Sequence, residues 1–103
     1  MSKNEQLIIN TIVKQVFDNL PYIGKNLDGI RLYYCNAYVY YMNHYIILKS
    51  YNNIVAVYDG EQNILYDGLR YVYGYTATSA QHIAKFKKFL PDKPEQVLTY
   101  RNI

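Results

Sequence analysis

The sequence is poor in the residue types that build disulfides and metal sites. Its 103 residues include one cysteine, two histidines and no tryptophan. Because Cys35 has no second cysteine to pair with, an intrachain disulfide is excluded, which is typical of a chain that works in a reducing cytoplasm. One cysteine and two histidines are also too few for a tetrahedral zinc site of the usual composition. The sequence therefore predicts no metal and no cofactor.

Long apolar runs and a strong excess of one charge are also missing. The longest apolar stretches are shorter than a membrane span requires, and Met1 to Glu5 do not resemble the basic start of a secretion signal. We therefore expect neither secretion nor contact with a membrane. The formal net charge of +3 permits contact with nucleic acid or another acidic surface, and it argues against an acidic mimic of DNA.

The sequence is rich in tyrosine, with 14 residues against three phenylalanines. Tyrosine favours strands, and its ring can be buried while its hydroxyl reaches water or a hydrogen-bond partner. So many tyrosines cannot all lie inside a domain of this size, and several should line a half-exposed face of a sheet. They either stabilise the sheet as cross-strand pairs or form a contact surface for a partner, and their number favours some contact surface.

The spacing of apolar residues predicts one α+β domain over residues 1–103. Residues 3–20 and 78–90 show apolar residues at helical spacing, and both helices should pack on a sheet. Between them we expect four or five antiparallel strands in meander order, because every connection is too short for a parallel crossover. The tail over 92–103 is either a short last strand or a docked extension. A loop is expected over 21–29, and strand-like segments are 30–36, 37–43, 45–51, 54–58, 64–66 and 69–75.

Short motifs indicate where the elements begin and turn. Ser2 or Asn4 can cap the first helix. Thr78, followed three positions later by Gln81, has the spacing of a capping box for the second helix. The pair Asn52-Asn53 predicts a hairpin turn, because asparagine tolerates the positive φ angles of such turns.

Residues able to carry catalysis are few, and structural roles explain them as well. His82 falls on the second predicted helix, where a hydrogen bond from its ring can tie the helix to the sheet or a loop. A structural role is also expected of His44. The alternative is a small enzyme in which His82 acts with Thr78 or Ser79, but no base and orienting acid can be identified beside either hydroxyl. We therefore predict no catalytic residue.

Two groups of residues are candidates for binding a partner. Lys85, Lys87 and Lys88 form a basic patch on the second predicted helix, and Lys93 and Arg101 are candidates to extend it. The patch is either a solvated helix face or a contact with phosphates. Tyrosines of the first strands are candidates for binding hot spots or for stacking on unpaired bases. The tyrosines predicted to make this contact are Tyr38, Tyr40, Tyr41 and Tyr45.

Two segments carry a family resemblance, and together they cover residues 46–89. The first is Ser50-Tyr51-Asn52-Asn53-Ile54-Val55-Ala56, and the second runs from Tyr75 to Ile83 and is followed by Phe86. They resemble the Ser-Tyr-x-Thr-x-Val-Ala hairpin and the Tyr-Ser-x-Thr-Thr-Ser-x-His-Ile helix start of a family of small uncharacterised proteins. That family is common in phages and mobile elements of Gram-positive bacteria. The positions that depart from its pattern are Asn53, Thr76, Ser79 and Ala80.

The resemblance implies a biological context and no reaction. Small phage-borne proteins of this kind often act as stoichiometric inhibitors of host defences, including anti-CRISPR proteins. We therefore expect a non-catalytic interaction protein, a monomer or dimer in the cytoplasm of a host bacterium. It would inhibit a host protein or nucleoprotein complex, such as a Cas effector, by occupying its surface. The alternative is a nucleic-acid-binding accessory or regulatory protein of a phage, whose affinity for free nucleic acid falls steeply with salt.

Overall fold

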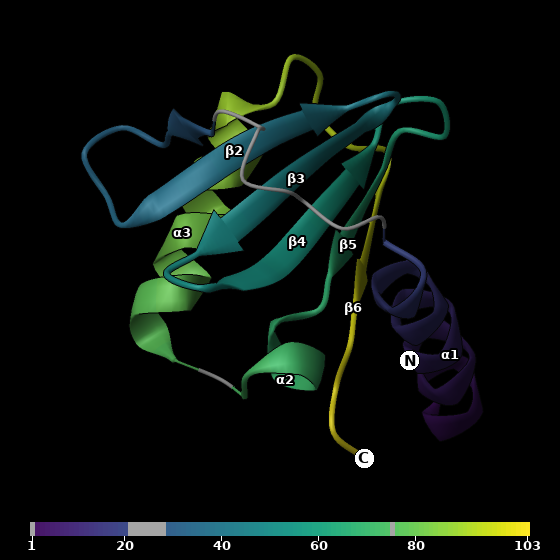
Figure 1. Ribbon diagram of the computed structural model, residues 1–103. Coiled ribbons are helices and arrows are strands. Elements are labelled where there is room, and N and C mark those ends of the chain that lie inside the picture. Colours follow the sequence, from purple (N-terminus) through teal and green to yellow (C-terminus); the bar gives the residue numbers. More distant parts are fainter. Residues whose placement is uncertain (1, 21–28, 75) are drawn as a thin grey trace.

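The protein has an α+β fold, with helices packed around one mostly antiparallel sheet (Figure 1). The computed structural model describes residues 2–20, 29–74 and 76–103. The predicted fold class is confirmed. The helices are α1 (Lys3–Asp18), α2 (Leu69–Val72) and α3 (Ala77–Phe89). The strands are β1 (Ile30–Arg31), β2 (Ala37–Met42), β3 (Tyr45–Ser50), β4 (Asn53–Asp59), β5 (Ile64–Asp67) and β6 (Gln96–Thr99).

The six strands lie side by side in the order in which they occur in the sequence. β1 to β5 are antiparallel neighbours, as the short turns between them require, and one row across β2 to β5 is Tyr40, Ile47, Val57 and Tyr66. β6 instead pairs in parallel with β5. The expectation that every connection is too short for a crossover is wrong here, because α2 and α3 lie between these two strands. The tail is thus a last strand.

The main core lies between α3 and the face of the sheet that α3 covers (Figure 1). Side chains alternate between the two faces of a strand, so Val39 of β2 and Leu48 of β3, which are cross-strand partners, point together toward α3. Phe86 of α3 is completely shielded from solvent at the centre of this layer. The core residues are Leu32, Ala37, Val39, Ile46, Leu48, Val55, Ala56, Tyr58, Leu65, Leu69, Ile83, Phe86 and Leu90.

α1 docks beside β5 and β6 through side-chain amides (Figure 1). Gln6 Nε2 donates to the carbonyl oxygen of Thr99 at 2.9 Å. Asn10 Nδ2 donates to the carbonyl of Arg101 at 2.7 Å, and its Oδ1 accepts from the amide of Arg101 at 2.9 Å. Asn10 therefore pairs with the segment after β6 as a neighbouring strand would, and it occupies backbone groups that would otherwise be open to another chain.

The apolar stripe predicted for the first helix is only partly buried. The residues of α1 that are buried are Gln6 and Val13. Leu7, Ile8 and Ile12 remain 48%, 62% and 37% exposed. Apolar spacing thus identified the helix but not the centre of its buried face, because the polar amide of Gln6 is drawn inward by its backbone partner on β6.

The caps of the two long helices agree with the sequence in one case and not in the other. Ser2 caps α1 as predicted, since its Oγ accepts from the amide of Glu5 at 3.1 Å. α3 is capped by Thr76, whose Oγ1 accepts from the amide of Ser79 at 3.2 Å. The capping role predicted for Thr78 is therefore wrong, and the helix begins two residues earlier than the capping-box spacing of Thr78 and Gln81 suggests.

One further local prediction is wrong, and a predicted hairpin is present with its turn shifted by one residue. The strand expected over 69–75 begins as helix α2, because Asp67 Oδ1 accepts from the amide of Leu69 at 3.2 Å and turns the chain there. The hairpin between β3 and β4 turns at residues 51 and 52, and Tyr51, with φ of 53°, takes the left-handed conformation expected of an asparagine. Apart from Gly29, the predicted loop over 21–29 lies outside the described residues, as does Tyr75.

Gly68 allows α1 to approach the start of α2 closely. A Cβ atom on Gly68 would lie 2.5 Å from the ring of Phe17. We expect Gly68→Ala to displace Phe17 and to lower the free energy of unfolding by about 1–3 kcal/mol, as overpacking does. Urea unfolding measures this loss. In the Gly68→Ala/Phe17→Ala double variant the two losses should be less than additive, and full additivity would show that the two residues do not meet.

Candidate interaction surface

The structure distributes the four predicted contact tyrosines over both faces of the sheet. Tyr38 and Tyr40 point away from α3, because the residue between them points into the core. Tyr45 begins β3, and its ring lies on that of His44 with the centroids 4.1 Å apart. Tyr41 points to the α3 side of the sheet and is 52% exposed. The four rings therefore do not share one face.

The three predicted lysines are all exposed on α3, but they spread around the helix. Successive residues of a helix are about 100° apart, so Lys85 and Lys87 lie on opposite flanks with Lys88 between them. Lys85 reaches toward the segment between β1 and β2, where its Nζ lies 2.9 Å from the Sγ of Cys35. Lys87 lies on the other flank, beside β5 and the segment after β6. The three lysine side chains therefore point in different directions around the helix axis and do not form one patch.

His82 belongs to a buried polar network that joins α3 to β3. Its Nδ1 lies 2.7 Å from the Oγ of Ser50, and that oxygen lies 2.9 Å from the Oγ of Ser79. Burial lowers the pKa of His82, and the positive charge of Lys85 lowers it further. The predicted role of His82 as an anchor between helix and sheet is confirmed. The imidazole and both hydroxyls are almost wholly shielded from solvent, which favours anchoring over catalysis.

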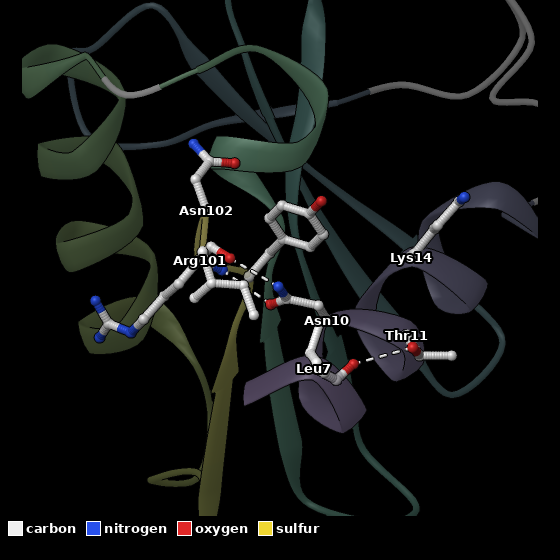
Figure 2. A pocket seen from close by; sticks show the side chains of 8 residues that line it. Leu7, Asn10, Thr11, Lys14, Arg101 and Asn102 are labelled. Atoms are coloured by element: carbon white, nitrogen blue, oxygen red, sulfur yellow. Dashed lines mark hydrogen bonds between the residues drawn. The ribbon is translucent and has the colours of Figure 1, made fainter. Parts of the chain in front are cut away.

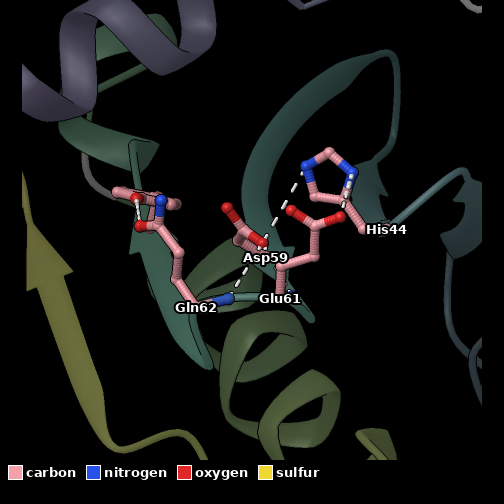
Figure 3. A network of polar contacts seen from close by, with 5 residues as sticks. His44, Asp59, Glu61 and Gln62 are labelled. Atoms are coloured by element: carbon pink, nitrogen blue, oxygen red, sulfur yellow. Dashed lines mark hydrogen bonds and ion pairs between the residues drawn. The ribbon is translucent and has the colours of Figure 1, made fainter.

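His44 belongs to a second polar cluster, which joins two turns (Figure 3). Its Nε2 lies 3.9 Å from Oδ1 of Asp59, and its Nδ1 lies 3.7 Å from Oε1 of Glu61. The same oxygen of Asp59 accepts from the amides of Glu61 and Gln62 at 2.9 and 3.3 Å. The amide of Gly60 donates to the carbonyl of His44 at 2.8 Å. The cluster therefore fastens the β2–β3 turn to the β4–β5 turn.

A hollow of about 280 Å³ lies between α3 and the β5–β6 end of the sheet, and we call it the α3 hollow. Its rim is basic, with Arg70 from α2, Lys87 from α3 and Arg101 from the segment after β6. Its wall is apolar, and Asp67 and Thr99 complete the lining. The apolar wall consists of Leu69, Ala80, Ile83 and Ala84.

Among the residues that the structure describes, Asp67 is the only acidic one in the lining of the α3 hollow. Burial raises the pKa of its carboxyl group. The amide of Leu69, which donates to the carboxylate, and the charges of Lys87, Arg101 and Arg70 act in the opposite direction. The three cations thus lie close enough to affect the titration of Asp67, and they do so from three different elements.

A second hollow, of about 320 Å³, lies between α1 and the C-terminal segment (Figure 2). Lys14 of α1 and Arg101 supply its basic residues, and Asn10 lies between them with its amide on the backbone of Arg101. Arg101 therefore borders both hollows. We name Lys14, Arg70, Lys87 and Arg101 the C-terminal basic surface. The other residues that line the second hollow are Leu7, Thr11, Tyr100, Asn102 and Ile103.

Sequence reasoning found part of this surface. It named Lys87 and listed Arg101 as a candidate to extend the lysine patch, and the structure brings these two residues to one hollow. It missed Arg70, because the segment that carries it was expected to be a strand. No local pattern connects these positions, since they meet through the parallel pairing of β6 with β5.

Metal-binding and membrane-spanning features are not found in the part of the chain that the structure describes. Within residues 2–20, 29–74 and 76–103, no group of three or more histidine, cysteine, aspartate or glutamate side chains is arranged to hold a metal ion. Nor does any helix of these segments combine the length and the apolar character needed to cross a bilayer.

Comparisons with known proteins found no match. No protein-family model matches the chain, no curated protein is significantly similar in sequence, and no solved structure is significantly similar in fold. The resemblance of residues 46–89 to phage and mobile-element proteins therefore stays a prediction. A function has to be argued from the chain's own residues.

Proposed function

We propose that the protein is a non-catalytic interaction protein that binds an acidic surface of its partner in stoichiometric amounts. The observation that carries this proposal is the C-terminal basic surface, to which α1, α2, α3 and the segment after β6 each contribute one cation. Like charges that the fold gathers from separate elements repel one another. An acidic partner offsets this repulsion, and long-range attraction steers such a partner to the surface.

The partner class is the one that the sequence resemblance implies. We propose a host protein or nucleoprotein complex, such as a Cas effector, which is inhibited because its surface is occupied. Lys88 is exposed beside Lys87, and Tyr41 is half-exposed on the α3 side of the sheet, so both can extend the contact. Tyrosine is enriched at such contacts, and a lysine at their margin adds long-range attraction to an acidic partner. Inhibition by occupation involves no turnover, so it must saturate at equimolar amounts.

Reversing two charges on α3 should weaken this binding strongly. For Lys87→Glu/Lys88→Glu we expect an affinity about 100-fold lower, since each reversed charge in a complementary contact costs about a factor of ten. Calorimetric titration of a guide-loaded Cas effector measures the affinity and the stoichiometry, and a cleavage assay measures inhibition.

The matched control is Lys3→Glu/Lys49→Glu, which makes the same change in net charge on α1 and on a strand of the sheet. It should keep most of the affinity. If both double variants weaken binding equally, the binding is due to general electrostatic attraction and not to a defined contact. Inhibition at clearly substoichiometric amounts would refute the proposal, because it requires turnover.

Free nucleic acid is the second candidate partner, and one observation favours it. The rings of Tyr71 and Tyr100 lie 5.1 Å apart. Tyr71 directly follows Arg70 in the sequence, and Tyr100 directly precedes Arg101. Aromatic rings next to cations are the combination with which proteins bind unpaired strands. Binding to a single-stranded oligonucleotide that weakens steeply with salt supports this candidate, and salt-independent or absent binding rejects it.

A further inference from the structure

We infer that two neighbouring turns, which we call the tyrosine turns, bind single-stranded nucleic acid by stacking its bases on tyrosine rings. The tyrosine turns are the β1–β2 turn, with Tyr33 and Tyr34, and the β3–β4 turn, with Tyr51. This inference goes beyond the proposed function, because it concerns a part of the molecule separate from the C-terminal basic surface and from Tyr71 and Tyr100. Its test needs no host protein.

The two turns lie side by side at one end of the sheet (Figure 1). The first residue of β2 and the last residue of β3 are cross-strand partners. The amide of Tyr51 then donates to the carbonyl of Asn36 at 2.9 Å, which ties one turn to the other. Tyr33, Tyr34 and Tyr51 are 51%, 95% and 49% exposed. The fold therefore presents three exposed tyrosines from one end of the sheet.

The backbone conformation is unfavourable for two of these tyrosines. Among the described residues, four that are not glycine have a positive φ. In the turns at the opposite end of the sheet these residues are Asn43 and Asn63, and asparagine is enriched in the left-handed region. In the tyrosine turns they are Tyr33 and Tyr51, each with φ of 53°. An asparagine at either position would relieve strain, so the rings need a reason outside the turn geometry.

Packing against the described part of the chain does not supply that reason. The ring of Tyr51 lies 5.7 Å from that of His82, yet half of Tyr51 remains exposed. Tyr33 is exposed to the same degree, and Tyr34 beside it is almost entirely exposed. Exposed rings on strained turns are expected where a ligand covers them.

Two cations beside the rings favour nucleic acid as the ligand. Nε of Arg31 donates to the carbonyl of Cys35 in the β1–β2 turn at 2.9 Å. Lys85 of α3 reaches the same turn, with its Nζ 2.9 Å from the Sγ of Cys35. Both Arg31 and Lys85 are exposed. Aromatic rings beside cations can hold unpaired bases and the phosphates between them, whereas lysine is depleted at contacts between proteins.

Tyr33→Asn is the first test, because the inference predicts opposite effects on stability and on binding. Asparagine relieves the left-handed conformation, so Tm should rise by about 2–6 °C. The same variant should bind a single strand about five- to tenfold more weakly, because one stacked base is lost. Asn43→Tyr makes the reverse change at the other end of the sheet. It should lower Tm and, as a distant site, change the affinity by less than about twofold.

Binding is measured by fluorescence anisotropy with labelled oligothymidylate and oligouridylate of about ten nucleotides, a length within the range of single-strand sites. Tyr34→Leu should lower the affinity about tenfold, whereas Tyr34→Phe keeps the ring and should change it by less than about twofold. Arg31→Gln should reduce the slope of log affinity against log salt by about 0.7, the value for one phosphate contact on a single strand. A duplex of the same length should bind more weakly, because its bases are already stacked on one another.

The choice of oligonucleotide identifies the natural ligand. Tighter binding of oligothymidylate assigns the tyrosine turns to DNA, and tighter binding of oligouridylate assigns them to RNA. Equal binding assigns them to the bases and phosphates that both share. Each of these results supports the inference. Absence of saturable binding, equal affinity for the duplex, or a lower Tm in Tyr33→Asn would each overturn it.

Two further outcomes separate this inference from the proposed function. Loss of affinity in Tyr100→Leu but not in Tyr34→Leu would place the strand on the C-terminal segment and overturn the inference. If no oligonucleotide binds but Tyr34→Leu weakens inhibition of a host protein, the tyrosine turns contact that protein and the inference is wrong. A chain that binds oligonucleotides through these turns without inhibiting a host protein loses only the proposed function.

Discussion

Phe86→Ala is expected to lower the free energy of unfolding by about 3–5 kcal/mol, which is the usual cost of removing a buried aromatic side chain. Phe86 is completely shielded from solvent and lies in the core layer between α3 and the sheet. A domain of this size has a total stability of about 5–15 kcal/mol, so the variant should be close to unfolding at ambient temperature. Thermal and urea unfolding followed by circular dichroism measure the loss.

The matched control for this prediction is Phe89→Ala, one turn further along the same helix. Phe89 is only partly buried and packs against the edge of the core. Its loss should cost clearly less, because part of its ring already contacts water. Similar losses in the two variants would contradict the assignment of Phe86 to the centre of the core.

Ser50→Ala is expected to lower the free energy of unfolding by about 2–4 kcal/mol, although it removes one oxygen atom only. The oxygen of Ser50 is the shared partner of His82 Nδ1 and the Ser79 hydroxyl. Its removal leaves two polar groups without this partner inside the protein, and each such group costs about 1–3 kcal/mol. Thr78→Ala is the control, since Thr78 is exposed on the same helix and Thr76 supplies the cap.

The same network predicts how stability depends on pH. The folded chain lowers the pKa of His82 below its ordinary value of 6.5, mainly through burial. Below pH 6.5 the unfolded chain therefore binds a proton that the folded chain resists, and the free energy of unfolding falls as the pH drops toward the lowered pKa. In His82→Gln this part of the acid-side loss should disappear. An unchanged pH profile in that variant would mean that His82 is not held neutral by the fold.

Residues with local partners were predicted well from the sequence. The helices and the hairpin strands have periodic apolar patterns that depend on a few neighbouring positions. His82 was assigned an anchoring role because a single histidine without identifiable catalytic partners is expected to form a structural hydrogen bond. Ser50 in β3 is its hydrogen-bond partner in the structure. Ser2 was assigned as a cap because its side chain acts within one helical turn.

Features that depend on distant partners were not predictable. The parallel pairing of β6 requires α3 to cross over first, and no short pattern in residues 96–99 encodes that. The burial of Gln6 depends on a carbonyl 93 positions away. The basic rim of the α3 hollow combines cations from three elements, and one of these, α2, was mistaken for a strand because its tyrosine and valine also suit a strand.

The docking of α1 on the segment after β6 joins the first element that is synthesised to the last one. A ribosome releases the helix first, yet Gln6 and Asn10 find their backbone partners only after Thr99 and Arg101 have emerged. Strands β1 to β5 can pair as successive hairpins in the meantime, since each needs only its neighbour. A nascent chain that stalls before β6 leaves Gln6 and Asn10 without these backbone partners, so the amide contacts of the first helix mark a polypeptide that has been made through its sixth strand.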